Sequence, residues 1–565
     1  MRPGRTIDDE LVNASLVGVA ILAIVAATLN GAGAVAAWLC GAQRPSVDIA
    51  SALRVLADPA HPGRALGSPE IPAILYWGVV AVFSVIAAGV VLIVRRVVAG
   101  TRHRAERDPH RLPGTATARD IRAAASAQAL LKRAQDLRPS LSRPRAPDVG
   151  YRIGSSRGID VWASVEDSIL VLGPPRSGKG LHIVINSILN APGAVVTTST
   201  RPDNIAATIA ERRKRGPVAV FDPQGLASEH SGDLRWSPIR GCDDPLTAMI
   251  RANGLASATG LSSGGVESGG FWEGKTRIVL QSLLHAAALD NRSPAELFGW
   301  TLAPAAAADA VAILSSHPQA TTGWADAIES VIHADPRQRD SIWMGVSLAL
   351  ACLADPRVLD AVSPRPGEEF DPREFLTNNG TVYLLSTGAG AGASWALVAA
   401  FIEDLAETAR HLAASSPRAR LDPPLLLALD EIGNLAPLPS LPTLMAEGGG
   451  TGITAMPVLQ SLSQARDRWG DHAANAIWDA SIVKIILGGT SASRDLQDLS
   501  ALIGDRDDLT DSTTIGDYGA RSTQRSARRI PVMTPEAIRT LPFGTGLVLL
   551  RSTRPIISRL RPWHR

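Results

Sequence analysis

Eight consecutive residues, Gly173 to Gly180, form the stretch with the clearest chemical meaning, GPPRSGKG. In a glycine-rich loop between a strand and a helix, backbone N–H groups point at an anion, and glycines let the backbone approach phosphates closely. Lys179 is expected to reach the β- and γ-phosphates. This lysine is informative because the chain has 51 Arg and only five Lys. We predict that ATP phosphates bind to Gly173, Pro174, Pro175, Arg176, Ser177, Gly178, Lys179, Gly180 and Leu181.

One position departs from the phosphate-loop pattern G-x-x-x-x-G-K-[ST]. Gly180 stands where a Ser or Thr hydroxyl would bind Mg²⁺, so the metal must be held by water and another carboxylate. The alternative interpretation is a glycine-rich turn that binds no ligand. An apolar run before the loop, Ile169 to Leu172, and a helix-period stretch after it favour the phosphate loop.

A second chemical signal is LLLALDEIGNL, Leu425 to Leu435, an apolar run that ends in two adjacent acids. Many buried strands end in one acidic residue, so the run alone is a weak signal. Downstream of a phosphate loop it predicts the hydrolytic half of the site. Asp430 would hold Mg²⁺ through water, and Glu431 would polarise the attacking water.

Two further polar residues follow apolar strands. Gln460 ends TAMPVLQS and would sense the γ-phosphate or orient water; the alternative is that it caps the next helix. Asp222 ends VAVFD, near the predicted site, or else caps the following turn. The residues Thr197 to Thr200 are expected at the same sheet edge.

The elements that must position these residues alternate between strands and helices. Such alternation predicts a parallel sheet with crossover helices, and therefore an α/β fold with at least seven strands. Between Pro245 and about Leu359 strand patterns give way to helical ones, which predicts an all-helical insertion. Near its start, Gly260 to Trp272 reads GLSSGGVESGGFW, which we interpret as a flexible loop.

Two uncharged runs precede this region. Leu11 to Gln43 and Ile71 to Val94 are each long enough to cross a bilayer as a helix. Arginines crowd the end of the second run, so the positive-inside rule places everything after Val94 in the cytoplasm. The alternatives are buried helices of a soluble protein or, for the first run, a cleaved signal peptide.

These patterns divide the chain into four parts. We expect a membrane anchor at 1–100, with spans at about 11–40 and 71–95, and a linker at 101–148. The nucleotide-binding domain takes 149–240 and 365–565, and the helical insertion takes 241–364. Within the linker, Ala118 to Leu137 is predicted as one helix, and Asp505 to Arg529 as a polar hairpin or loop.

Charge and cysteine spacing exclude a protein that binds nucleic acid over its whole surface and a metal site built from cysteines. A net charge of +2 does not fit a protein that binds nucleic acid over its whole surface, so DNA contacts must come from a patch or an assembled surface. Cys40, Cys242 and Cys352 are too far apart in sequence for a metal-ligand motif.

The motifs together resemble the TraG/TraD-type coupling proteins of type IV secretion and conjugation. The resemblance rests on GPPRSGKG, VFDPQG, the GGFW segment, LDEIGNL, VLQSLSQARDRWG and RRIPVMTPEAIRTLP. It runs from about Val149 to the end and includes the two apolar runs. The family often has GKG at the phosphate loop, so Gly180 does not contradict it.

The resemblance implies a RecA-like P-loop ATPase domain that carries an all-helical domain. It further implies a multi-pass anchor in the lipid of the bacterial inner membrane, with the ATPase in the cytoplasm, and assembly into a ring, expected to be a homo-hexamer. ATP hydrolysis with Mg²⁺ would drive a relaxase-bound single DNA strand, or protein cargo, to a secretion channel with its own ATPase and membrane components. The helical insertion would recognise cargo. Candidates for an arginine finger acting in trans are Arg466, Arg468 and Arg494.

Two other functions remain open at this stage. An FtsK-like translocase of double-stranded DNA has the same chemistry, but usually carries a winged-helix DNA reader that finds no room after the last predicted strand. A non-hydrolytic receptor would use nucleotide only to hold a ring together and would recruit protein cargo. The presence of Lys179, Asp430 and Glu431 argues against a receptor, because a scaffold does not need a residue that activates water.

Overall fold

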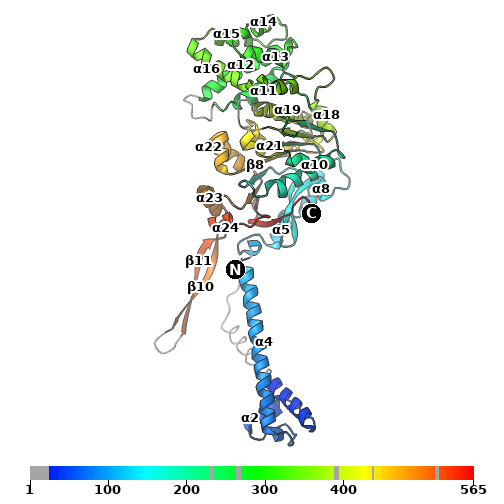
Figure 1. Ribbon diagram of the computed structural model, residues 1–565, viewed down its shortest axis with the longest axis vertical. Helices are drawn as coiled ribbons and strands as arrows, with labels where there is room; N and C mark the ends of the chain where they lie inside the picture. Colours follow the sequence, from blue (N-terminus) through cyan, green and yellow to red (C-terminus); the bar gives the residue numbers. More distant parts are fainter. Residues whose placement is uncertain are drawn as a thin grey trace. The chain divides into compact units, whose positions relative to one another are not determined.

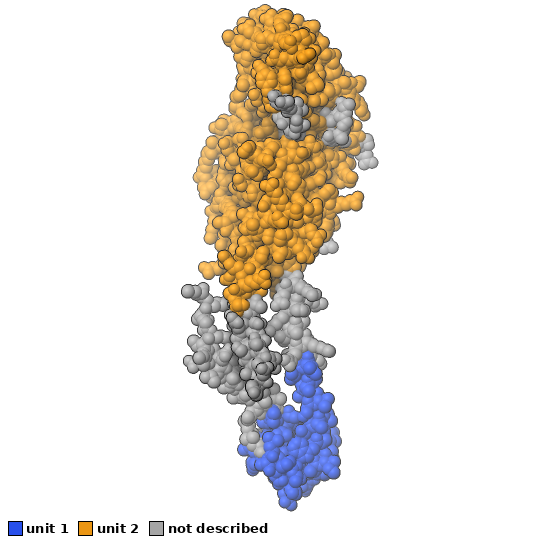
Figure 2. Space-filling view, turned by 90° about the vertical axis from the view of Figure 1, so that its left-hand side faces the viewer, with its two compact units in different colours: residues 1–108 blue, residues 109–565 orange. Residues whose placement is uncertain are grey.

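The computed structural model describes residues 25–46, 48–107, 109–227, 234–261, 269–386, 394–435, 438–515 and 521–564. The chain forms two compact units, Met1–Asp108 and Pro109–Arg565 (Figure 2). Each unit has a hydrophobic core of its own. The predicted nucleotide-binding residues all lie in the second unit.

The first unit is built on apolar helices. Among the described residues, one stretch is long and apolar enough to cross a membrane, Ala73–Leu92, in the first part of helix α4 (Ala73–Arg107). A shorter apolar helix, Val25–Cys40, packs against it, and the Tyr76 hydroxyl donates to the Leu29 carbonyl at 3.0 Å. The rest of the expected first span, 11–24, lies outside the described residues, so a second crossing stays a prediction. The described part of the unit also contains two short helices, α2 (Ile49–Ala57) and α3 (Pro62–Ala65).

The sequence predicts a linker over residues 101–148, and this prediction is wrong for residues 109–148. This stretch folds onto the main sheet, and the side chains of Ile121, Leu130 and Leu137 share a buried core with the strands. The single helix expected over Ala118 to Leu137 is three shorter ones. At the first break, the Ser126 hydroxyl caps the next helix by accepting a bond from the Ala129 N–H. The elements are η1 (Pro109–Arg111), α5 (Ala118–Ala124), α6 (Ala127–Leu131), α7 (Ala134–Leu137) and α8 (Ala146–Val149).

The second unit is organised around one sheet of eleven strands in the order β2-β1-β13-β12-β9-β3-β8-β7-β4-β6-β5. The seven strands from β9 to β5 are parallel, and the four beyond β9 are antiparallel. The strands are β1 (Gly150–Ser156), β2 (Ile159–Ser164), β3 (Ile169–Leu172), β4 (Val195–Ser199), β5 (Val218–Phe221), β6 (Thr381–Leu385), β7 (Leu425–Leu429), β8 (Ile453–Leu459), β9 (Val483–Leu487), β12 (Thr545–Leu550) and β13 (Ile556–Leu560).

The sequence of the inner strands explains their position. Strands β3, β4, β6, β7 and β8 consist of buried residues throughout, which is typical of parallel strands covered by helices on both faces. The predicted α/β fold is therefore confirmed, and the strand β13 was missed. The helices that connect the strands are η2 (Gly180–Val184) with α9 (Ile185–Asn190), α10 (Asp203–Arg212), α18 (Pro372–Thr377), α19 (Trp395–Ala414), η6 (Pro417–Ala419), α20 (Ile432–Leu435), α21 (Leu441–Thr451), α22 (Leu462–Ala480), α23 (Ser493–Ile503) and α24 (Pro535–Arg539).

Among the described residues between β5 and β6, the regular elements are helices and the only strand pairing is one isolated bridge, as the sequence predicts. These helices gather at one end of the second unit (Figure 1). A buried charge pair joins them to helix α19, since the Arg251 guanidinium lies 2.8 Å from Asp404 of that helix. They are α11 (Pro245–Ser257), α12 (Gly269–Leu289), α13 (Pro294–Thr301), η4 (Pro304–Ala307), α14 (Ala308–Ser316), α15 (Trp324–Ile332), α16 (Pro336–Ala349), η5 (Ala351–Ala354) and α17 (Pro356–Ala361).

The polar segment expected as a hairpin or loop is a hairpin. Strands β10 (Asp505–Ile515) and β11 (Arg521–Pro531) pair with each other and form a separate two-stranded sheet. The hairpin projects from the end of the second unit opposite to the helical region (Figure 1).

Candidate nucleotide site

The predicted phosphate loop connects the buried strand β3 to a helix, and its conformation explains two of its glycines. A Cβ at Gly173 would stand 2.6 Å from the Ser177 hydroxyl, so the loop closes only around glycine. Gly178 has φ +89°, and a Cβ there would stand 2.7 Å from the His182 ring. Arg176 is also left-handed, at φ +64°. Loops that cradle phosphates use such backbone conformations to present successive N–H groups on one side.

Lys179 stands at the end of this loop and folds over it. Its ammonium donates to the carbonyls of Gly173 and Pro174, at 2.6 and 2.9 Å. Burial lowers the pKa of Lys179, and the carboxylates of Asp430 and Glu431 partly oppose that shift. An ammonium has three donors, and these two carbonyls take two of them. The third donor remains for an anion in front of the loop.

The helix that follows begins with a wider turn. Residues Gly180–Val184 form a π-helical turn before the regular helix α9, a feature that often marks functional sites. A Cβ at Gly180 would meet nothing within 4 Å. The position that departs from the phosphate-loop pattern is therefore open, with room for a hydrated ion or for a larger side chain.

The two acids follow strand β7, and strand β4 next to it holds them in place. The Thr198 hydroxyl donates to the Asp430 carbonyl at 2.7 Å, and the Thr200 hydroxyl donates to the Glu431 carboxylate. Glu431 has φ +54°, a strained conformation for a residue other than glycine. Strain of this kind is typical of functional positions, where the surrounding structure fixes the side chain.

Asp430 and Glu431 differ in their surroundings. Burial, together with the neighbouring charge of Glu431, raises the pKa of Asp430 to about 6. The amide of Asn204 contacts Asp430 at 3.4 Å, and this contact and the charge of Lys179 act in the opposite direction. A carboxylate that ionises with difficulty gains most from a nearby cation. Asp430 therefore suits a cation that arrives with a ligand.

Strand order explains how Gln460 enters the site. Strand β8 lies between β3 and β7, so the residue after β8 lies between the phosphate loop and the acids. The cap of the following helix α22 is Ser461, which rules out the capping role for Gln460. The Gln460 N–H donates to the side chain of Gln464, whose amide donates to Asn434 at 2.8 Å. Gly433 permits this contact, since a Cβ there would stand 2.7 Å from the Gln464 side chain.

All these groups border one cavity of about 770 Å³ at the carboxyl edge of the sheet. Asp430, Glu431 and Gln460 line it. Of the nine expected phosphate-binding residues, six line it, and the other three, Gly173, Pro174 and Ser177, shape the loop behind it. The six are Pro175, Arg176, Gly178, Lys179, Gly180 and Leu181.

Several residues of the cavity were not predicted. Asn204, Asn434 and Gln464 are neutral amides, and nothing in their local sequence marks them, although Asn434 and Gln464 each follow a predicted residue by three or four positions. Asp222, by contrast, does not line the cavity. Its carboxylate accepts from the N–H groups of Leu226 and Ala227 and caps a turn.

The candidates for an arginine finger separate in the structure. The Arg466 guanidinium lies 3.0 Å from Asp495, a buried carboxylate of the same chain. Arg468 and Arg494 are exposed and do not line the cavity. The charge of Arg466 is thus already paired within its own subunit.

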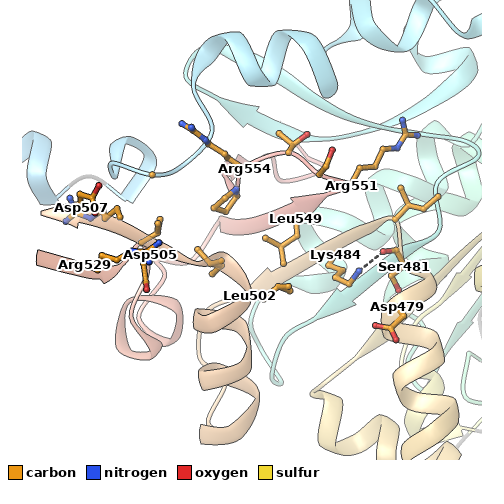
Figure 3. A pocket seen from close by; sticks show the side chains of 18 residues that line it. Asp479, Ser481, Lys484, Leu502, Asp505, Asp507, Arg529, Leu549, Arg551 and Arg554 are labelled. Atoms are coloured by element: carbon orange, nitrogen blue, oxygen red, sulfur yellow. Dashed lines mark hydrogen bonds between the residues drawn. The ribbon is translucent and has the colours of Figure 1, made fainter. Parts of the chain in front are cut away.

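Another cavity is larger but has different chemistry. It has a volume of about 870 Å³ and lies at the base of the hairpin, around the start of β9 and the end of β12 (Figure 3). Its lysine, Lys484, donates to the carbonyl of Ser481 at 2.6 Å, and its Arg551 pairs with Asp167. No phosphate loop borders it, so the smaller cavity is the nucleotide-site candidate.

Comparison with known proteins supports the family resemblance over part of the chain. Residues 424–543 match a family model described as the TraM recognition site of TraD and TraG. Residues 424–543 of the chain therefore form a TraG/TraD-type domain. The resemblance inferred from the motifs is therefore confirmed. No curated protein sequence matches the chain.

Solved structures agree on the fold. The bacterial conjugative coupling protein TrwB, in a trigonal form with sulphate, matches with a TM-score of 0.54 and 18% identity, over 78% of this chain and 93% of that one. A TrwB structure with ADP and Mg²⁺ matches with a TM-score of 0.51 and 19% identity, over 76% and 91%. At this identity, the similarity establishes that this chain shares the TrwB fold.

Proposed function

We propose that this TraG/TraD-type protein is a membrane-anchored coupling ATPase that drives DNA, or protein cargo, toward a type IV secretion channel. The observation that carries the proposal is the arrangement around the 770 Å³ cavity, where Lys179 of the phosphate loop, the acids Asp430 and Glu431, and Gln460 meet at one sheet edge. The similarity to TrwB, a coupling protein crystallised with nucleotides, supports it.

The residues fit ATP with Mg²⁺. The described residues contain no group of three or more His, Cys, Asp or Glu able to hold a metal by themselves. Mg²⁺ typically binds one or two carboxylates together with substrate phosphates and water, so it would come with the nucleotide. Asp430 would hold it through water, in the open space beside Gly180. When bound, Mg²⁺ neutralises charge on the phosphates.

The remaining residues take distinct roles. Lys179 positions the β- and γ-phosphates through the donor that its loop carbonyls leave unused. Glu431 polarises the attacking water, and the bond from Thr200 fixes the direction of its carboxylate. Gln460 stands between the two and senses the γ-phosphate. In a ring, an arginine from the neighbouring subunit would complete the site; Arg468 and Arg494 are exposed enough to serve, whereas Arg466 is paired.

The partner surfaces follow from the family match. The matched segment, 424–543, runs from β7 to the residues after α24 and includes the hairpin, so we propose it as the surface for a DNA-associated partner. It does not overlap the helical insertion, whose cargo role stays a prediction. The membrane anchor with two crossings in the inner membrane, the hexameric ring and the channel components stay predictions as well.

The test is ATP turnover by residues 109–565 without nucleic acid, with single-stranded DNA and with duplex DNA. The segment starts at 109, because residues 109–148 are part of the folded core. Lys179→Ala and Glu431→Gln are the controls. DNA-stimulated turnover that both variants abolish supports the motor, and preference for duplex DNA favours an FtsK-like translocase. ATP binding and ring assembly without turnover would contradict the motor hypothesis and support the non-hydrolytic receptor.

A further inference from the structure

The nucleotide cavity has an apolar wall that phosphate chemistry does not use. Leu181 and Ile185 lie one helical turn apart just after the phosphate loop, and both line the cavity. The third large apolar side chain beside them is Trp563, which belongs to the segment after strand β13. Phosphates need N–H groups and cations, so this wall is free for another part of the ligand.

Two hydrogen bonds hold the segment of Trp563 over the helix that follows the loop. The backbone N–H of Trp563 donates to the Leu181 carbonyl at 3.2 Å, and the side-chain amide of Asn186 donates to the Arg561 carbonyl at 2.8 Å. The backbone beside the indole is thus fixed to the helix start. A residue far away in sequence becomes a wall of the cavity.

The indole is not packed into a core. Trp563 is 37% exposed. It lines the nucleotide cavity and also a neighbouring hollow of about 430 Å³ that contains Trp162 and Asn190. An indole that stands between two hollows keeps aromatic surface available, which a tryptophan that only fills a core does not.

We propose that Trp563, with Leu181 and Ile185, forms the subsite for the purine base of the nucleotide. This proposal rests on the proposed function, because Lys179 and the acids fix the phosphate end. The base then extends past Leu181, where it stacks on the indole. Stacking uses the flat face that every base has, so Trp563 sets affinity for a nucleoside and does not select adenine over guanine.

The test compares two ligands that share phosphates and differ in the base. Binding of ATP and of inorganic tripolyphosphate, both with Mg²⁺, is measured on the full chain in detergent. Trp563→Ala and Trp563→Leu are expected to weaken ATP binding by about 5- to 150-fold, the range that corresponds to losing one base–aromatic stack. Tripolyphosphate binding should stay within about twofold, since it does not use the stack. Trp563→Phe should restore most of the ATP affinity.

A matched control is available in Phe543. It is another exposed aromatic residue against the phosphate loop, since a Cβ at Gly178 would stand 3.0 Å from its ring, yet it does not line the cavity. Phe543→Ala should therefore leave the ratio of ATP to tripolyphosphate affinity unchanged.

Two results would overturn the subsite. One is an equal loss of affinity for ATP and for tripolyphosphate in Trp563→Ala, which would make the indole a structural support of the loop. The other is unchanged ATP binding in that variant. Failure of the proposed function looks different: the wild-type chain would bind neither ligand, or Lys179→Ala would bind both normally.

Discussion

Asp430→Asn is predicted to stabilise the fold while it removes function. The structure raises the pKa of Asp430 to about 6 from its ordinary value of 3.8. A pKa that is higher in the folded state means that ionising the group costs folding free energy at neutral pH. Two units correspond to about 3 kcal/mol at pH 7. Asparagine removes this cost and keeps a polar group beside Asn204.

The stabilisation predicted for Asp430→Asn should depend on pH. As the pH falls toward the unfolded pKa, the carboxyl becomes neutral in both states, so the advantage of asparagine shrinks. It is roughly half as large at pH 5 and small below pH 3.8. The assay is thermal unfolding of residues 109–565 at pH 7 and pH 5 without nucleotide. We expect the variant to unfold a few degrees higher at pH 7, by about 3–6 °C, and by roughly half as much at pH 5.

Asp222→Asn is a control with the opposite sign. Asp222 follows the strand β5 and accepts two backbone N–H bonds, so its replacement should lower stability by about 1 kcal/mol. The reasoning is refuted if Asp430→Asn lowers the unfolding temperature at pH 7, or if its effect is the same at both pH values.

Three further predictions follow from the structure. ATP turnover should fall below about pH 6, by up to tenfold per unit, because protonated Asp430 does not attract a cation; a pH–rate profile that is flat to pH 5 would contradict this. Gly180→Ser should be tolerated and should lower the Mg²⁺ concentration for half-maximal turnover a few-fold, since the position is open; a magnesium titration decides. Asp404→Asn should destabilise by about 3–5 kcal/mol, because Arg251 is left buried without its partner, whereas Asp404→Leu combined with Arg251→Met should lie closer to wild type in urea denaturation.

The parts of the site that could be predicted from sequence are those that lie in one stretch of chain. A glycine-rich loop between a strand and a helix, and a strand that ends in Asp430 and Glu431, are local patterns with a direct chemical meaning. Both are placed in one cavity by the structure. Their catalytic roles remain proposals.

The parts that sequence did not show depend on strand order and on distant contacts. The sequence left open whether Gln460 enters the site or caps a helix, and no local pattern gives the strand order that decides, with β8 between β3 and β7. Trp563 reaches the cavity only because its segment crosses the helix after the loop. Such placements follow from tertiary packing, which has no signature in a short window of sequence.

The wrong boundary at 109–148 has a similar cause. Residues Ala118 to Leu137 are rich in Ala, Arg and Gln, a composition that suits a solvated helix. Three of their large apolar side chains, Ile121, Leu130 and Leu137, are buried against the sheet, whereas Leu131 is exposed. Three short helices bury them where one continuous helix was expected. The count of apolar residues was therefore less informative than their positions.

The most direct test of the central claim separates binding from hydrolysis at this cavity. Equilibrium binding of Mg·ATP and single-turnover hydrolysis are measured for wild type, Lys179→Ala and Glu431→Gln. The account predicts that Glu431→Gln binds ATP within about threefold of wild type but hydrolyses it at least ~100-fold more slowly, and that Lys179→Ala loses binding. Hydrolysis at the wild-type rate in Glu431→Gln would contradict the assignment of this cavity as the catalytic site.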